Sequence, residues 1–524
     1  MLSSTLILSG MMIVSRIAGF IRFRILAGYF TKEELDIFYA AFRIPDLVFE
    51  ILINGALSTA FIPFFVQYQK RPDEQNKVIS SVINMVTLVL SGFIVILVIA
   101  MPLLMPVLAP GFTPEQASIL VAYSRILLLG QLPFLVLGNF LSGISQAKKS
   151  FLIPALAPVV YNIAIIIFIY LFADQYHLMA PITGVVLGAF FFFVVQLPVL
   201  HYSQFRYELI ITHIKESIRF FRVAVPRILT IIVSQIDATV DLTLATLLGP
   251  GSYTIFYLAQ RLQLLPVSVF GMALGQASLP YLTEVFQEKR MKEFKNIIVN
   301  SMLSIFFFTI PSAAFLIITR TPIVRLFYGG QKFDWDATVL TAFTLSYFAI
   351  ALPLHAIYYF VTRCFYAIFD TKTPFYVTAV TIVLSACLSL FFILVLKLPV
   401  WSLALSFSIT MSLRTIILLI FLYAKIGGFD VWYFGKETLR ISIAAFNTSV
   451  LSYFLTRLLD GLILDTSRTL NVFILLTIAG SFYLVVYLFL SWLFGVKEMY
   501  LITKMVMKIR GSKSKVTEIY QSVE

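Results

Sequence analysis

The sequence SRIAGFIRFRILAGYF (15–30), followed by DIFYAAFRIPDLVFEILINGALSTAFIP (36–63), places charged side chains inside two apolar segments. The second segment, and the first together with the apolar residues before it from residue 4, are each long enough for a helix that crosses about 30 Å of hydrocarbon. An arginine at the centre of such a helix costs about 2.5 to 3.5 kcal/mol on insertion scales. The charged side chains must therefore face a cavity lined by protein or water. They are Arg16, Arg22, Arg24, Asp36, Arg43, Asp46 and Glu50.

The rest of the chain has the same membrane character. Of its 524 residues, 60% are hydrophobic and 12% are charged, whereas about a quarter of the residues in soluble proteins are charged. The net charge of +13 does not form one basic face, because the lysines and arginines are spread over short segments between apolar stretches. We therefore predict a polytopic membrane protein and no nucleic-acid partner.

Apolar windows of spanning length predict an all-α membrane protein with about fourteen transmembrane helices. An even number of helices places both termini on the same side of the membrane. The expected helices are 4–30, 35–68, 79–109, 116–146, 152–173, 178–203, 217–248, 253–285, 297–320, 337–368, 374–396, 400–424, 437–459 and 469–495.

The basic residues predict on which side of the membrane the two termini lie. The segments after even-numbered helices hold most of the lysines and arginines, whereas those after odd-numbered helices hold few beyond Lys32, Lys332, Lys397 and Arg468. Positively charged loops stay on the cytoplasmic side, so we expect both termini in the cytoplasm. The first thirty or so residues lack the basic start and cleavage site of a signal peptide and are expected to remain as a helix.

An internal repeat predicts the domain organisation. IFYAAFR at 37–43 recurs as IFYLAQR at 255–261, and the Leu-Pro pair at 132–133 recurs at 352–353. Six helices separate the copies, so the two halves have the same orientation and enclose a cavity. We expect lobes at 1–212 and 213–430, two further helices within 431–496 that the repeat leaves over, and a basic cytoplasmic tail at 497–524.

The helix at 35–68 has a polar face. Asp36, Arg43 and Glu50 are spaced seven residues apart, a drift of only about 20° per step, so all three are expected to face the cavity. Arg43 could be neutralised by Asp46 at i+3, which leaves a structural ion pair and a ligand contact equally open. Glu50 could pair with an arginine of the helix at 4–30.

Further charges lie in other predicted helices. Arg16 is expected near mid-membrane, with Arg22 and Arg24 about 9 and 12 Å further outward. Asp237 and Asp241 on the helix at 217–248 could hold a coupling cation or proton, or pair with cavity arginines. Arg261, on the helix at 253–285, has no acidic residue within one turn in the sequence, so we predict that it binds an anion. Arg414 has no evident partner in the sequence.

Sequence motifs of common enzymes are missing. The sequence holds no GxSxG, Walker A or HExxH motif. Cys364 and Cys387 lie alone in apolar segments, without a CxxC or a nearby histidine. We therefore expect no catalysis, no cofactor and no metal site.

Three stretches resemble one family over nearly the full chain. They are SRxxGFxR at Ser15–Arg22, the run from Asp36 through FRIPDL to GALSTAFIPFF, and GPGSYTIFYLAQRLQLLPVSVFGMALGQASLP at Gly249–Pro280. The chain resembles the MurJ family, the lipid II flippases of the multidrug/oligosaccharidyl-lipid/polysaccharide exporter superfamily. The resemblance implies a bacterial inner-membrane protein that moves lipid-linked peptidoglycan precursor to the outer leaflet by alternating access.

The resemblance also implies that the two helices within 431–496 form a groove for the lipid tail, and it implies site residues and partners. Arg16, Arg22 and Arg261 would contact the diphosphate-sugar head group, and Asp36 would be needed in the second helix; we add Arg24 and Arg43 as candidates. A diphosphate suits guanidinium groups, which bind its oxygens through paired hydrogen bonds. The implied partners are lipid II, membrane lipids and the cell-wall synthesis machinery.

The chain departs from the family pattern at two places. Many members carry RRxxAEG where this chain has FEILING, so Glu50 replaces an arginine and Asn54 replaces a glutamate. The expected cavity is therefore less cationic, which Arg24 offsets. Some members are thought to bind sodium through acidic and amide side chains of several helices. Asp241 matches one of these ligand positions. The helix at 374–396 offers only the hydroxyl groups of Ser385 and Ser389, so it does not match the pattern of sodium ligands.

Other functions remain open from the sequence. An exporter of another lipid-linked oligosaccharide, or an ion-coupled drug exporter of the same superfamily, is the nearest alternative. Clustered arginines argue against a cationic drug, because like charges repel strongly in a cavity of low dielectric constant. A non-transporting scaffold for envelope assembly would leave the intramembrane arginines unexplained.

Overall fold

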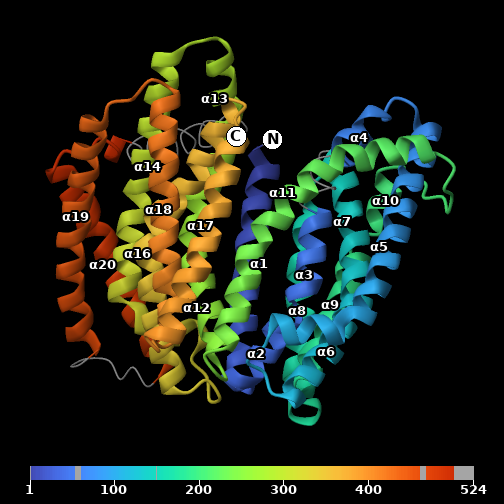
Figure 1. The fold of residues 1–524 in the computed structure, drawn as a ribbon, viewed down its shortest axis with the longest axis horizontal. Coiled ribbons are helices and arrows are strands. Elements are labelled where there is room, and N and C mark those ends of the chain that lie inside the picture. Colours follow the sequence, from blue (N-terminus) through green and yellow to red (C-terminus); the bar gives the residue numbers. More distant parts are fainter. Residues whose placement is uncertain (1, 54–60, 149, 461–467, 501–524) are drawn as a thin grey trace, which may run out of the picture. The chain divides into compact units, whose positions relative to one another are not determined.

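The computed structural model describes residues 2–53, 61–148, 150–460 and 468–500, and the regular elements in these ranges are all helical (Figure 1). Each of the fourteen predicted segments contains helix in its described residues. Ten helices there are long and apolar enough to cross a membrane. The all-α membrane fold is confirmed, whereas the number fourteen stays a prediction. The other four segments, 4–30, 35–68, 217–248 and 437–459, all contain charged side chains.

The chain forms two compact units. The first comprises Met1–Phe256 and Phe327–Thr338. In it, α8 packs along both α9 and α1, and α11 packs on α5. Its helices are α1 (Leu2–Tyr29), α2 (Lys32–Ala41), α3 (Arg43–Glu50), α4 (Ile62–Gln67), α5 (Pro72–Leu108), α6 (Pro114–Ile126), η2 (Leu127–Gln131), α7 (Leu132–Ala147), α8 (Leu152–Tyr176), α9 (Met179–Val194), α10 (Pro198–Tyr202), α11 (Ile214–Thr246) and the start of α12 (Ser252–Pro266).

The second unit comprises Tyr257–Leu326 and Val339–Glu524. Its core combines aliphatic and aromatic side chains, and Phe294, Phe360 and Phe365 are fully buried in it. In lipid, close packing of such side chains holds helices together. Its helices are η3 (Val267–Met272), α13 (Ala273–Gln287), α14 (Met291–Ile318), most of α15 (Arg320–Tyr328) and of α16 (Trp335–Ala367), α17 (Lys372–Leu390), η4 (Phe391–Val395), α18 (Trp401–Lys425), α19 (Val431–Leu458) and α20 (Thr469–Leu493).

These two units are defined by which residues contact one another in the fold. The predicted lobes at 1–212 and 213–430 follow the sequence repeat instead, and they stay a prediction, as do the two further helices at 431–496. The basic tail predicted at 497–524 lies outside the described residues from residue 501 onward.

A proline shapes the second predicted helix. Pro45 has no N–H to donate to the carbonyl of Ala41, four residues earlier, so the helix is interrupted at Phe42 between α2 and α3. The hydroxyl of Ser124 donates to the Ala41 carbonyl at 3.2 Å and so satisfies it. The next backbone bond, from Asp46 N to Phe42 O at 2.7 Å, restores the helix. The two pieces thus continue as one rod.

Two wide helical turns occupy matching places in the sequence repeat. Residues 51–53 are π-helical, and so is η3 at Val267–Met272. Since residue 37 matches residue 255, a shift of 218 carries 51–53 onto 269–271, inside η3. Such turns often mark functional sites in helices.

Candidate functional site

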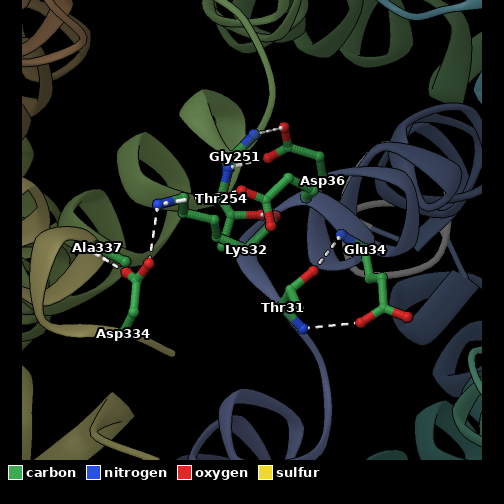
Figure 2. Close-up of polar contacts among 9 residues, drawn as sticks. Thr31, Lys32, Glu34, Asp36, Gly251, Thr254, Asp334 and Ala337 are labelled. Atoms are coloured by element: carbon green, nitrogen blue, oxygen red, sulfur yellow. Dashed lines mark hydrogen bonds and ion pairs between the residues drawn. The ribbon is translucent and has the colours of Figure 1, made fainter. Parts of the chain in front are cut away.

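Asp36 caps another helix instead of facing open space (Figure 2). Its side chain is 1% exposed. One carboxylate oxygen accepts from the N–H of Gly251 and the other from the N–H of Thr254, each at 2.6 Å. These N–H groups begin α12, where a helix has no internal acceptors and carries a partial positive charge. The structure therefore places this predicted ligand residue in a helix cap.

Further contacts join the start of α2 to the start of α12 (Figure 2). Thr254 Oγ1 donates to the Lys32 carbonyl at 2.9 Å, and Lys32 Nζ lies 3.4 Å from the carboxylate of Asp334. Gly251 has φ +82°, and a Cβ there would approach the Lys32 side chain to 2.5 Å. Only glycine fits this turn, because it tolerates positive φ and leaves room for the lysine. The start of α2 is thus fixed to the start of α12.

Arg43 reaches across to α11. Its Nε donates to Thr239 Oγ1 at 3.0 Å, and its Nη2 donates to the main-chain oxygen of Gln235 at 2.6 Å and to Gln235 Oε1 at 3.0 Å. Asp46, Asp241 and Glu50 also act on the guanidinium electrostatically. The sequence indicated Asp46 as a partner within the helix, but nothing in the sequence singled out Gln235 or Thr239.

The arginines of α1 differ in their surroundings. Arg16 is exposed, whereas Arg22 and Arg24 are half-buried. The Arg22 guanidinium lies 5.1 Å from the ring centre of Phe23 and 6.0 Å from that of Tyr161. Its Nε is buried and has no hydrogen-bond acceptor among the described residues. Arg22 thus has a buried donor for which the described residues supply no acceptor.

Arg261 and Arg414 lie in the second unit. Arg261 is exposed, its Nη2 donates to the Tyr257 hydroxyl at 2.7 Å, and its guanidinium stacks 4.7 Å from that ring. Arg414, for which the sequence offered no partner, is 4% exposed and donates to Thr381 Oγ1 at 2.7 Å. Tyr358 lies beneath the Arg414 guanidinium at 5.7 Å. The two positions differ in burial, because Arg261 is exposed and Arg414 is packed inside the second unit.

The residues considered for a cation have polar neighbours. Asp237 and Asp241 are half-buried on α11. Ser385 is tied to α18, because its carbonyl accepts from Ser406 Oγ at 3.0 Å and its hydroxyl accepts from Thr410 at 3.2 Å. In the described part of the chain, no three His, Cys, Asp or Glu side chains gather closely enough to hold a metal ion.

An apolar groove opens in the second unit between η3, α14 and α20. Its volume is about 340 Å³. Phe270 and Phe308 stack nearly parallel on one wall, with ring centres 4.8 Å apart. Gly480 on α20 also lines the groove and adds no side chain to it. The remaining lining residues are Phe307, Pro311, Ser312, Phe315, Tyr483, Leu484, Tyr487 and Leu488.

Comparison with known proteins assigns the family. A family model described as lipid II flippase MurJ matches residues 27–489. The chain belongs to the MurJ family. A relative from Buchnera aphidicola subsp. Schizaphis graminum (strain Sg), named probable lipid II flippase MurJ, is 24% identical over 495 residues, which cover 92% of this chain and 95% of the relative.

Solved structures agree with the MurJ assignment. A lipid II flippase MurJ in an inward closed conformation superposes with a TM-score of 0.75 at 26% identity, covering 93% of this chain and 98% of that one. An inward-facing multidrug resistance MATE transporter of the MOP superfamily superposes with a TM-score of 0.69 at 15% identity, covering 79% and 94%. The second likeness concerns the fold alone.

Proposed function

We propose that this MurJ-family chain moves lipid II from the cytoplasmic to the outer leaflet of a bacterial inner membrane by alternating access. The match to the lipid II flippase family over residues 27–489 carries the proposal. Support also comes from solved structures of related transporters that are described as inward closed and inward-facing. We place both termini in the cytoplasm on the charge pattern of the loops.

The arginines that hold the head group are proposed to be Arg16, Arg22, Arg24 and Arg261. Arg16 and Arg261 are exposed on membrane helices, where a charge without function would be costly. Arg22 has a buried Nε that lacks an acceptor in the described residues. Arginine binds diphosphate oxygens through a planar fork, whereas lysine offers a single point charge. The ligand class that fits best is therefore a lipid diphosphate.

The groove beside α20 is proposed to take the lipid tail. Its walls are aromatic and aliphatic, and Ser312 contributes a hydroxyl that already donates to Phe308 O at 2.6 Å. A polyprenyl chain needs no hydrogen bonds, so these walls match its chemistry. The sequence indicated a groove between the helices at 437–459 and 469–495; the groove described here uses the second of these with α14 and η3.

Complementation of a bacterium depleted of its own lipid II flippase tests the proposal. Arg16→Lys and Arg261→Lys should lose much of the activity although charge is kept, and the alanine variants should lose nearly all of it. Arg457→Ala is a matched control, because Arg457 stacks 5.5 Å from Tyr453, four residues earlier, much as Arg261 stacks on Tyr257. Membrane abundance of each variant separates transport from expression.

Direct binding distinguishes the substrate. Purified protein should bind lipid II, and the alanine variants at Arg16 and Arg261 should bind it at least about tenfold more weakly if each loses a charge-assisted hydrogen bond. Wild-type rescue by both alanine variants at normal abundance would remove the phosphate-binding role. Equal binding of a lipid diphosphate with an unrelated sugar would favour an exporter of another lipid-linked oligosaccharide.

A further inference from the structure

Two charged residues attach one face of the α2–α3 rod to α11 and to the start of α12. Asp36 binds the start of α12 through the N–H groups of Gly251 and Thr254. Arg43, two helical turns further along the rod, binds Gln235 and Thr239 on α11. Seven residues bring the two side chains to nearly the same face, about 10.5 Å apart along the axis. The rod is therefore attached at two levels by side chains of opposite charge.

The helical backbone of the rod is continuous between these two levels. Its backbone continues past Phe42 through the bond from Asp46 N to Phe42 O. Ser124 on α6 supplies the donor that Pro45 removes. If a rod that is hydrogen-bonded through this interruption moves as one body, the Arg43 end leaves α11 only when the Asp36 end tilts.

The acceptors for Arg43 form a small network of their own. Thr239 Oγ1 accepts from Arg43 Nε and donates to the Gln235 carbonyl at 3.0 Å. The same carbonyl also accepts from Arg43 Nη2. The guanidinium is thus bound through two of its nitrogens to one turn of α11, which fixes its direction as well as its position.

We infer that Gln235 and Thr239 are positioning residues: by holding Arg43 on α11 they keep Asp36 on the start of α12, and the two contacts open and close together as one latch. The latch deepens the proposed function, because alternating access requires a contact that closes one side of the cavity and can be released. Arg43 then serves the conformational cycle, while its counterpart in the repeat, Arg261, faces the ligand.

Amide exchange at Gly251 and Thr254 reports on the latch directly. These N–H groups lie at the first turn of α12, where no helical acceptor exists, and Asp36 is the acceptor that protects them. In purified full-length protein, Asp36→Asn should speed their exchange. Thr239→Val removes a hydroxyl on α11 without touching α12, yet it should also speed exchange at these two amides, by about tenfold if one charge-assisted bond is lost.

The chain offers matched controls. Thr243 lies one turn further along α11 and nearer to Gly251 in the sequence, and its hydroxyl donates to Thr239 O. Thr243→Val should leave exchange unchanged, and Thr239→Ser, which keeps the hydroxyl, should restore protection. Gln235→Met, which removes the side-chain acceptor and keeps the volume, provides a second variant if Thr239→Val folds poorly.

One pattern of amide exchange would show that the latch is wrong. If Asp36→Asn speeds exchange at Gly251 and Thr254 while Thr239→Val and Gln235→Met do not, the two contacts are independent. This measurement needs no substrate, so it is separate from the arginine complementation test. If the wild-type chain failed to complement the depleted bacterium, the proposed substrate would be wrong and the latch would stand. If amide exchange were unchanged in the α11 variants, the latch would be wrong and the proposed substrate would stand.

Discussion

Glu50 lies two turns beyond Arg43 on the same rod and is half-buried. Its carboxylate acts on the Arg43 guanidinium electrostatically, together with those of Asp46 and Asp241. Attraction between opposite charges is stronger here than in water because the surroundings are less polar. Glu50 therefore stabilises the position of Arg43 without being expected to touch a ligand.

Replacement of Glu50 by arginine should destabilise the protein. Glu50→Arg would place a second cation beside Arg43, whereas Glu50→Gln would only remove the attraction. Losing one partner of a fully buried pair costs about 3 to 5 kcal/mol, and a half-buried residue should lose less. In thermal unfolding of purified protein, the Tm should be highest for wild type, lower for Glu50→Gln and lowest for Glu50→Arg. Glu284→Arg, at an exposed position of α13, is the control. Wild-type stability and transport by Glu50→Arg would contradict this role.

The sequence identified ionisable residues better than it identified their partners. The charge of Asp36 and Arg43 inside an apolar segment already indicated a special environment. Their acceptors and donors are 192 to 218 residues away along the chain, and no local pattern marks them. Arg414 is similar, since Thr381 lies 33 residues before it. Periodicity shows which face a side chain occupies, but it does not show what the fold brings to that face.

The connection between α5 and α6 passes very close to the backbone at the end of α11, and this limits which residue it can hold. Gly111 lies on the exposed connection between α5 and α6, yet a Cβ there would come within 1.8 Å of the Thr246 carbonyl oxygen at the end of α11. Because the obstacle is backbone, no side chain can turn aside to make room. The connection must shift if any other residue is placed there.

Gly111→Ala should therefore destabilise the first unit by about 1 to 3 kcal/mol, the usual cost of forcing extra atoms into packed structure. Gly92→Ala is the control, because a Cβ at Gly92 on α5 meets nothing within 4 Å and alanine favours helix over glycine by about 1 kcal/mol. Thermal unfolding in detergent should show a lower Tm for the first variant only. Equal Tm values would mean that the connection moves freely.

Helices were easier to predict than their irregularities. Long apolar windows located the ten helices that are long and apolar enough to cross a membrane in the described residues, because a membrane requires continuous helix of a certain length. The short helix α15 at Arg320–Tyr328 and the π-helical turns were not predicted, since neither changes the average hydropathy of a window. The interruption at Phe42 had a visible cause in Pro45, but the hydroxyl that compensates for it comes from α6.

Orientation in the membrane is a property of the whole molecule that the fold does not fix. The loop charges predict that Asp174 and Gln331 lie outside and that Glu288 lies inside. All three side chains are exposed, so a cysteine at each should be reachable from its own side. The native Cys364 and Cys387 must first be replaced, as Cys387 is exposed.

In intact cells, an impermeant thiol reagent should label Asp174→Cys and Gln331→Cys and leave Glu288→Cys unlabelled until the cells are opened. The reason is that lysine- and arginine-rich loops are retained in the cytoplasm. Labelling of Glu288→Cys in sealed cells would invert the orientation and, with it, the direction of the proposed transport.

Arg43 and Arg261 occupy the same place in the two copies of the repeat, but one is bonded into a helix pair and the other stacks on its own tyrosine in the open. A half-length ancestor that assembled with itself would have presented this arginine twice in identical settings. In a single chain that carries both copies, each position can change alone. The different surroundings of Arg43 and Arg261 are an instance of this freedom, because the chain keeps the arginine in both copies and only one of the two is bonded to another helix.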